Sequence, residues 1–412
     1  MKILAITDSY PPHHSGGYEL RSRDVLTGLT MRGHDVRVIT TRCPSPNCTL
    51  HLDEKNIFRV LRKRSDTHSF ILRISFDIFE LRFLDRMLKS MKPDIIYLSH
   101  LGDLSKPIFF FFSNRNFPIV FDDGGAGIVY LSRVFKQGLY FYERETASFF
   151  QSKAKSLIVE GISLLSGNLI PKKLAWPKKM SVYFNNKRSL EIARQNNVPF
   201  LNEKILYSGV DLKIFPCKTQ DEPHVPLRIV VPGRIEPNKG TRDVISLVEI
   251  LEQMGIQTSV TVVGKVDHQS YYDDLLKYVE QLNLKSDVRF QSMLDHERLA
   301  SIYRESDICF FPSYQKPGMS RVPLEAMASG CLVISYGNEA SNEVIVNSKT
   351  GYLVDEGDVQ AVAAIVKDVV EDPTIYESVI GRARTYIETS CSLETYIDKI
   401  EKYMTSIIKE FV

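Results

Sequence analysis

Short apolar runs alternate with helical patterns along this chain, and the alternation starts afresh halfway along it. The apolar runs cover residues 2–6, 35–40, 94–98, 119–121 and 156–159 in the first half, and 227–231, 259–263, 288–290, 308–311, 332–335 and 351–354 in the second. Helical patterns lie between them, most clearly at 18–31 and 70–91. Strands that alternate with helices form parallel sheets with crossover helices. The chain is therefore expected to fold as two α/β domains.

The length of the chain also favours two domains, because 412 residues exceed the chain length that a single hydrophobic core usually supports. Residues 213–226 contain three prolines and several polar side chains, which is typical of a linker. We expect a first domain at 1–210 and a second at 211–391. A C-terminal helix at 392–412 is expected to pack back on the first domain.

The composition is that of a soluble globular protein, with 43% hydrophobic and 25% charged residues. No apolar run approaches the roughly 20 residues that cross a bilayer, and the start MKILAITDSYPP lacks the pattern of a signal peptide. A cytoplasmic location is expected, at most with peripheral contact at the inner face of a membrane. The six cysteines have no histidine pair at ligand spacing, so we expect free thiols and no metal site.

Charge is spread unevenly along the chain. Residues 1–200 carry 30 Lys and Arg against 18 Asp and Glu, whereas the remainder carries 22 against 32. A basic first half favours an anionic acceptor or an anionic membrane surface, with the lysine-rich stretch 153–188 and its Trp176 as the candidate contact. The helix at 70–91 could also lie on a membrane, although such helices more often pack on their own sheet. A basic domain that docks on an acidic one explains the asymmetry equally well.

Polar clusters fall where the predicted strands end. In open parallel sheets, ligands bind beyond the carboxyl ends of the strands. Those positions hold Asp8, Gly16 and Gly17 after the first strand, His100 after the third, Asp122 and Asp123 after the fourth, and Arg234 and Lys239 after the first strand of the second half. Together these clusters predict one cleft between two domains.

The segment 313–330, SYQKPGMSRVPLEAMASG, follows a predicted strand and opens a helix that carries Glu325 near its start. Backbone N–H groups and the positive end of that helix point at whatever lies in front of residues 318–321, which makes an anion site. Combined with Arg234 and Lys239, this segment predicts a bound diphosphate. Taken alone, Glu325 would only complement the helix dipole.

Six segments, taken in order, carry a resemblance to a known family. They are SGGYELRSRDVLTGLTMRGHDVRVIT, YSGVDLKIF, GRIEPNKG, VRFQSMLDHERLASIYRESDICFFPS, PGMSRVPLEAMASGCLVIS and EVIVNSKTGYLV. They resemble the family 4 retaining glycosyltransferases, the group 1 glycosyl transferases, nearly from end to end. The resemblance implies the α/β GT-B fold, in which two facing Rossmann-like domains with parallel sheets are separated by a cleft.

The resemblance implies how a nucleotide-sugar donor is held. Gly16 and Gly17 would let the backbone approach the donor diphosphate, where a Cβ would obstruct it. Arg234 and Lys239 would neutralise the two phosphates, most importantly as negative charge grows on the leaving nucleotide. No metal and no cofactor are implied, because these side chains and a helix N-terminus take the place of Mg²⁺. The expected donor is a UDP-sugar first and a GDP-sugar second.

The resemblance also implies roles for residues 318–325 and for Met293. Backbone amides would hold the sugar and the β-phosphate at Gly318, Met319, Ser320, Arg321 and Val322. The resemblance assigns Glu325 to the ribose hydroxyls, from which its carboxylate would accept hydrogen bonds. Met293, with nearby backbone, would flank the base. All of these residues belong to the second predicted domain, which is therefore the nucleotide-binding one.

The chain departs from the family's pattern at two points. Relatives carry a glutamate for the hydroxyls of the transferred sugar eight residues before the position of Glu325, and here Pro317 stands there. Relatives often place a histidine–aspartate pair after the fourth strand, where this chain has Asp122 and Asp123. One of these aspartates is expected to contact the sugar or the acceptor hydroxyl, with His100 on the neighbouring strand. Turn formation before two glycines is the structural alternative for both aspartates.

The sequence thus predicts a metal-independent retaining glycosyltransferase of the hexosyltransferase type. Its expected partners are a nucleotide-sugar donor and a polysaccharide, lipopolysaccharide or lipid-linked acceptor, and no nucleic acid. Two alternatives stay open: a regulatory GT-B protein that binds nucleotide sugar without turnover, which Pro317 would favour, and a nucleotide-sugar epimerase. A nicotinamide enzyme is disfavoured because no G-x-G-x-x-G joins the first strand to its helix.

Overall fold

The computed structural model describes residues 1–13, 17–42, 55–63, 70–113, 115–125, 127–136, 160–172, 175–218, 222–284, 287–315 and 318–411. Gly16, Pro317 and the predicted strand at 156–159 lie outside these ranges. The chain forms two compact units, Met1–Leu206 with Ile397–Val412, and Tyr207–Tyr396. The segment 213–226, which the sequence suggested as a linker, belongs to the second unit, where its Phe215 is fully buried.

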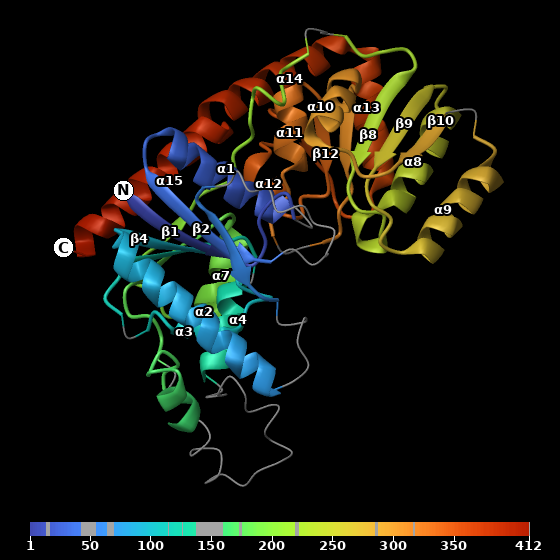
Figure 1. Ribbon diagram of the computed structural model, residues 1–412. Helices are drawn as coiled ribbons and strands as arrows, with labels where there is room; N and C mark the ends of the chain where they lie inside the picture. The colour runs from blue at the N-terminus through green and yellow to red at the C-terminus, as the bar shows by residue number, and fades with distance from the viewer. Residues whose placement is uncertain are drawn as a thin grey trace. The chain divides into compact units, whose positions relative to one another are not determined.

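The first unit is built on a seven-stranded parallel sheet with the strand order β3-β2-β1-β4-β5-β6-β7 (Figure 1). The strands are β1(Lys2–Thr7), β2(Asp35–Thr41), β3(Ile57–Leu61), β4(Ile95–Ser99), β5(Ile119–Asp123), β6(Met180–Phe184) and β7(Glu203–Ile205). The central strands are buried on both faces, as their continuous apolar sequences require. The four predicted strands within the described residues of this unit are confirmed, whereas β3, β6 and β7 were not predicted.

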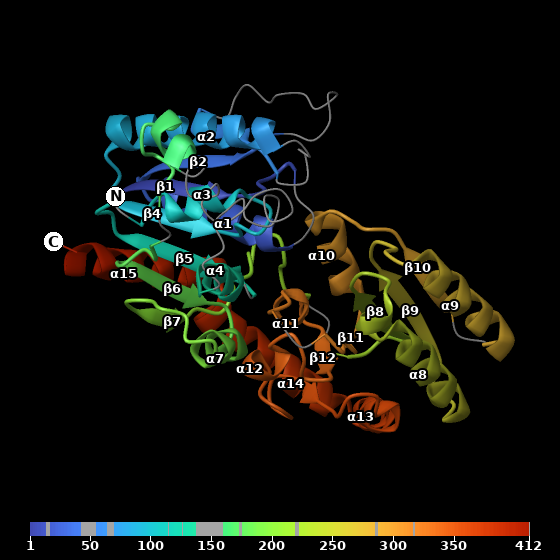
Figure 2. The same ribbon diagram turned by 90° about the horizontal axis from the view of Figure 1, so that it is seen from below.

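Helices cover both faces of this sheet. They are α1(Gly17–Met31), α2(Phe70–Met91), α3(Lys106–Phe110), α4(Gly127–Lys136), α7(Lys187–Gln195) and the C-terminal α15(Leu393–Phe411). Helix α1 and the part of α15 in this unit lie on one face, and α2, α3, α4 and α7 lie on the other (Figures 1 and 2). The first pair packs closely, because a Cβ on Gly28 of α1 would lie only 2.1 Å from Ile397 Cδ1.

The sheet of the first unit changes its winding direction beside β1. Strand β1 pairs with β2 on one side and with β4 on the other. In open parallel sheets, such a reversal leaves a crevice at the carboxyl ends of the strands, where ligands bind. Asp8 follows β1 and His100 follows β4, so the topology alone brings these two residues together.

The second unit is built on a six-stranded parallel sheet with the order β10-β9-β8-β11-β12-β13. Its strands are β8(Leu227–Pro232), β9(Thr258–Val263), β10(Asp287–Gln291), β11(Ile308–Phe311), β12(Leu332–Ser335) and β13(Tyr352–Leu353). All six apolar runs predicted in this half are confirmed as strands. The winding reverses beside β8, which pairs with β9 and β11, so residues directly after β8 lie at the expected ligand position.

The helices of the second unit also cover both faces of their sheet. They are α8(Thr241–Gln253), α9(Gln269–Leu282), α10(His296–Glu305), α11(Val322–Ser329), α12(Ser341–Val344), α13(Val359–Glu371) and α14(Pro373–Tyr386), with the single turns η2(Pro237–Lys239) and η3(Ile387–Cys391). Helices α8, α9 and α13 lie on one face, and α10 and α11 on the other (Figure 2). Between these layers the core is made of aliphatic strand residues such as Ile229 and Val260.

Two features bear on contact with a membrane. Among the described residues, no helix combines the length and the apolar character that crossing a bilayer demands. Helix α2 packs on its sheet through residues such as Leu81 and Leu84, which are fully buried. Trp176 is also buried, with its ring centroid 5.1 Å from that of Phe109 and its indole N–H donated to the carbonyl of Pro199. The prediction that Trp176 lies at an interface is therefore wrong, because the ring completes the core.

Candidate functional site

The turn after β8 holds the two predicted phosphate-binding cations. Gly233 follows β8, and Gly240 is the N-cap of α8, with a left-handed backbone (φ 67°) directly after Lys239. A Cβ on Gly240 would lie 2.1 Å from the carbonyl oxygen of Pro312, so only glycine allows this approach. The turn lines a small pocket together with residues from the ends of β9 and β11: Val231, Pro232, Gly233, Arg234, Lys239, Thr241, Val262, Phe311 and Pro312. Arg234 and Lys239 are thus brought together at the predicted place.

Carboxylates of the same unit balance both cations. Arg234 is half exposed and forms ion pairs with Glu236 at 2.9 Å and with Asp267 at 3.1 Å. Hydrogen bonds from Lys265 and Arg234 lower the pKa of Asp267. Lys239 is largely buried and forms an ion pair with Glu339, a residue that the sequence analysis did not single out. A ligand with more negative charge than these carboxylates can therefore compete for both side chains.

The loop before α11 has the features of an anion site. The amide groups of Gly318 and Met319 form no hydrogen bond with other described residues. The amide of Ser320 donates to the carbonyl oxygen of Glu339 at 3.1 Å, and that of Val322 donates to Ser320 Oγ at 3.3 Å. The first two amides are thus available to a ligand, and the next part of the loop is fixed by its own contacts.

Two further predicted donor-binding residues differ in exposure. Glu325 is only 4% exposed, and its Oε1 lies 3.3 Å from the Nε of Arg321. Burial, followed by the nearby carboxylate of Glu325, raises the pKa of Tyr303. Met293 follows β10 and is 68% exposed. Glu325, which is predicted to bind the ribose, is therefore buried next to Arg321. Met293, which is predicted to flank the base, is open to solvent.

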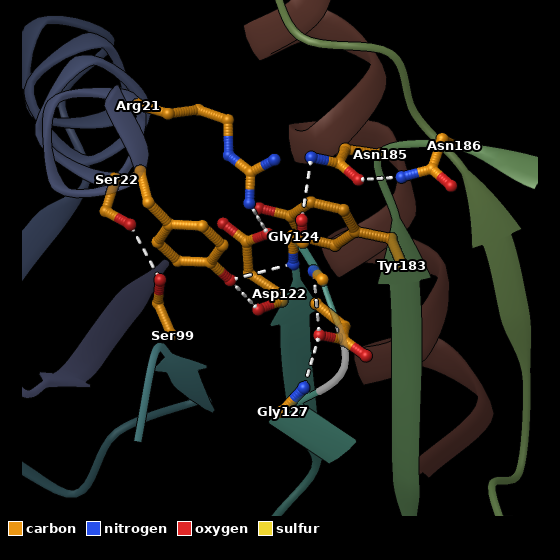
Figure 3. A network of polar contacts seen from close by, with 12 residues as sticks. Arg21, Ser22, Ser99, Asp122, Gly124, Gly127, Tyr183, Asn185 and Asn186 are labelled. Atoms are coloured by element: carbon orange, nitrogen blue, oxygen red, sulfur yellow. Dashed lines mark hydrogen bonds and ion pairs between the residues drawn. The ribbon is translucent and has the colours of Figure 1, made fainter. Parts of the chain in front are cut away.

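A buried polar network surrounds Asp122 in the first unit (Figure 3). Arg21, which projects from α1, forms an ion pair with Asp122 Oδ1, and both side chains are almost fully buried. Tyr97 donates its hydroxyl to Asp122 Oδ2 at 2.7 Å and lies 2.9 Å from the hydroxyl of Tyr183. Tyr18 donates to the carbonyl oxygen of Asp122. Both carboxylate oxygens of Asp122 are thus occupied by neighbouring residues of its own unit.

Asp123, the next residue, faces a different environment. Its Oδ1 accepts hydrogen bonds from the amides of Gly125 and Gly127 at 3.2 Å, which satisfies the start of α4. Its Oδ2 is buried and accepts no hydrogen bond from another described residue. Burial raises the pKa of this carboxyl to about 6. One oxygen of Asp123 is therefore buried without a hydrogen bond from another described residue.

His100 is joined to Asp8 at the point where the winding reverses. Its Nδ1 lies 2.6 Å from Asp8 Oδ1, and its ring is tilted by 37° against the ring of Tyr18, with the centroids 4.7 Å apart. Burial lowers the pKa of His100, but the hydrogen bond and the charge of Asp8 outweigh burial, so the net pKa is raised. The side chain is 44% exposed. Gly17, at the start of α1, is also exposed, and Gly16 lies outside the described residues.

Comparisons with known proteins show what the chain is similar to. Residues 218–386 match the family model described as glycosyl transferases group 1. Over these residues the chain is similar to the group 1 glycosyltransferases. It is 23% identical to glycogen synthase of Mycobacterium tuberculosis over 96% of this chain and 92% of that protein. It is 30% identical to the amylovoran biosynthesis glycosyltransferase AmsK of Erwinia amylovora over 44% of this chain and 45% of that protein.

Solved structures place this glycosyltransferase in the GT-B fold. The Anabaena protein Alr3699/HepE, solved in complex with UDP and glucose, superposes with a TM-score of 0.68 at 17% identity, over 98% of this chain and 100% of that chain. The two parallel α/β sheets of this glycosyltransferase are those that the fold requires. The enzyme transfers a sugar from a nucleotide-sugar donor to an acceptor.

Sequence reasoning missed two residues of this glycosyltransferase that the site depends on. Arg21 is one of two arginines near the start of α1, and only the fold shows its pairing with Asp122. Glu339 stands far from Lys239 in sequence and has no neighbouring motif. Its position after β12, at a carboxyl strand end, was the one signal available.

Proposed function

We propose that this glycosyltransferase uses a UDP-sugar as its donor, with a GDP-sugar as the second choice, and transfers the sugar without a metal ion and with retention of its anomeric configuration. The pocket after β8 supports this proposal most strongly. Arg234 and Lys239 line it, and Glu339 links Lys239 to the loop that carries the available amides of Gly318 and Met319. Two cations and two amide donors suit a diphosphate.

The chemistry follows from where charge develops. When the bond between the sugar C1 and the β-phosphate oxygen breaks, the electron pair stays on that oxygen, and the leaving UDP gains negative charge. Lys239 and Arg234 stabilise this charge more strongly than they stabilise the bound donor, which is what lowers the barrier. The acceptor hydroxyl attacks on the same face of the sugar, and its proton passes to the departing phosphate oxygen. This route needs no pair of acid and base side chains.

We assign the acceptor side to the first domain, residues 1–210, and the donor side to the second, residues 211–391. In the first domain, we propose Asp123, whose buried Oδ2 accepts no hydrogen bond from another described residue, and the half-exposed His100 as contacts of the acceptor or the transferred sugar. Asp122 holds Arg21 and Tyr97, so we give it a positioning role. We also propose that Gly17, at the start of α1, lets its backbone approach a diphosphate, where a Cβ would obstruct it.

The acceptor we propose is a polysaccharide, a lipopolysaccharide or a lipid-linked glycan. Two relatives support a glycan acceptor through their names, glycogen synthase and an amylovoran biosynthesis glycosyltransferase. The basic first half of the chain suits an acceptor that carries anionic groups or lies at an anionic membrane. Exposed Lys172, Lys178 and Lys179 would contribute to that contact at the cytoplasmic face of the membrane.

Thermal stabilisation by a panel of UDP-, GDP- and ADP-sugars tests the donor assignment. A ligand that binds only the native state stabilises it by RT ln(1 + [L]/Kd), so a true donor should raise the melting temperature selectively. Arg234→Ala should abolish that shift. Lys367→Ala is the matched control, because Lys367 is an exposed cation on α13 of the same unit. Equal shifts in the two variants, or no shift with any donor, would contradict the proposal.

A protein that binds nucleotide sugar without turnover is the second candidate, and one observation favours it. The Lys239 charge that should stabilise the leaving group is already paired with Glu339. Such a protein would show the selective thermal shift but would release no free nucleotide from the sugar donor. Measurement of nucleotide release from the same donor therefore separates the two candidates.

A further inference from the structure

Glu339 lies in an unusual stretch of backbone. Glu339 and Ala340 both have left-handed conformations, with φ of 48° and 58°, although neither is a glycine. Residues other than glycine adopt left-handed backbone conformations at a cost in conformational energy, and such residues are frequent at functional sites. The preceding Asn338 fixes the turn, because its Nδ2 donates to the carbonyl oxygen of Ser313 at 2.8 Å. Glycine at position 339 would relieve the strain but would remove the carboxylate.

The carboxylate of Glu339 is bound through one oxygen only. Lys239 Nζ and Ser313 Oγ both contact Oε1, the latter at 2.6 Å. Oε2 accepts no hydrogen bond from another described residue, although the side chain is almost buried. The carbonyl oxygen of Glu339 accepts a hydrogen bond from the amide of Ser320. Glu339 therefore contacts both the turn that carries Lys239 and the loop before α11. Its Oε2 is left without a hydrogen bond from another described residue.

We propose that Glu339 determines sugar specificity, with Oε2 accepting hydrogen bonds from hydroxyl groups of the transferred sugar while Oε1 holds Lys239 in place. This inference rests on the proposed function, which puts the donor phosphates at Lys239. The sugar is bonded directly to the β-phosphate, so a group in contact with the phosphate-binding lysine lies beside the sugar. Pro317, by contrast, has no side-chain acceptor to offer the sugar.

Electrostatics decide which part of the donor Glu339 contacts. A carboxylate and a phosphate repel each other, so a second anion beside Lys239 is unfavourable unless donors surround the carboxylate. Ser313 supplies one donor to Oε1, and a sugar supplies several hydroxyl groups. A free diphosphate supplies none. Glu339 should therefore favour the complete UDP-sugar over UDP, which is a contribution to specificity that Lys239 alone cannot make.

The test compares UDP with a UDP-hexose as ligands of wild type, Glu339→Gln and Glu339→Asp by calorimetric titration. The UDP-hexose is the one that gives the largest thermal shift with the wild type. Both variants should bind UDP as tightly as the wild type or a few-fold tighter. Their preference for the UDP-hexose over UDP should fall roughly 10-fold or more, the scale of a hydrogen bond to a charged group. Glu371→Gln, an exposed glutamate on α13, should change neither affinity.

Three results would overturn the inference. Tighter UDP binding together with faster release of UDP from the UDP-hexose would show that Glu339 blocks the site. If both variants have normal melting temperatures and an unchanged preference for the UDP-hexose over UDP, Glu339 only stabilises the turn. If the wild type binds neither UDP nor the UDP-hexose, the proposed function fails first. Because Glu339→Asp retains the charge, it separates loss of sugar contact from loss of the Lys239 partner.

Discussion

Asparagine at position 123 would keep the oxygen that satisfies the start of α4 and remove the charge beside it. In the wild type, Asp123 Oδ1 accepts the amides of Gly125 and Gly127, while Oδ2 is buried without a hydrogen bond to another described residue. Burial raises the pKa of the carboxyl from 3.8 to about 6. The carboxylate is thus less stable in the folded protein than in the unfolded chain.

The sign and size of the effect follow from this shift. Between the two pKa values the folded state binds more protons than the unfolded state, so the free energy of unfolding falls as pH rises. The whole loss is about 3 kcal/mol for a rise of about two units. Roughly half of it, about 1.4 kcal/mol, falls between pH 5 and pH 8. Asp123→Asn has no titrating group there, so its stability relative to wild type should rise by that amount over the same range.

Fluorescence of Trp176 gives the assay, because it is the one tryptophan of the sequence and lies in the core of the first unit. The melting temperature of Asp123→Asn minus that of the wild type should rise by about 3–5 °C from pH 5 to pH 8 for a unit of this size. Asp123→Ser should give a different constant offset but the same pH dependence, since it also lacks the carboxyl. A difference that does not vary with pH in either variant would refute the reasoning.

Three other predictions concern stability and the membrane. Gly264→Ala should prevent the second unit from folding, because its Cβ would lie 1.8 Å from the carbonyl oxygen of Gly233; limited proteolysis of that unit checks it. Asp307→Asn should cost about 3–5 kcal/mol, since it leaves the buried Lys218 without its partner carboxylate; urea unfolding measures the loss, and a cost under about 1 kcal/mol would contradict it. Glutamine at the exposed lysines 172, 178 and 179 should weaken adsorption to anionic vesicles at low salt, and unchanged sedimentation with vesicles would exclude the contact.

The fold could be predicted from the sequence wherever a strand is buried on both faces and therefore reads as a continuous apolar run. β11 and β12 are such strands, and their bounds match the prediction. β7 was missed because it has only three residues, Glu203–Ile205, two of them charged. β6, MSVYF, follows two lysines and contains a serine, so its burial depends on neighbours that the local sequence does not reveal.

In the candidate site, contacts between residues close in sequence could be predicted, whereas contacts between distant residues could not. Arg234 and Lys239 share one short turn, so their proximity is local information. The choice between Asp122 and Asp123 could not be made from sequence, because neighbouring strand residues point to opposite faces and the register was unknown. The fold shows that Asp122 faces Arg21 of α1 whereas Asp123 faces the start of α4. Glu339 needed the fold, since its contact with Lys239 spans one hundred residues of sequence.

The central claim is that Lys239 stabilises the leaving nucleotide of a sugar donor. The most direct measurement is release of free UDP from a UDP-hexose by wild type and Lys239→Ala, with EDTA present to remove divalent metals. The account predicts release by the wild type and a rate at least roughly 100-fold lower in Lys239→Ala, the scale of losing one preorganised charge partner, about 3 kcal/mol. Near-normal release by Lys239→Ala, or release by the wild type that EDTA abolishes, would contradict it.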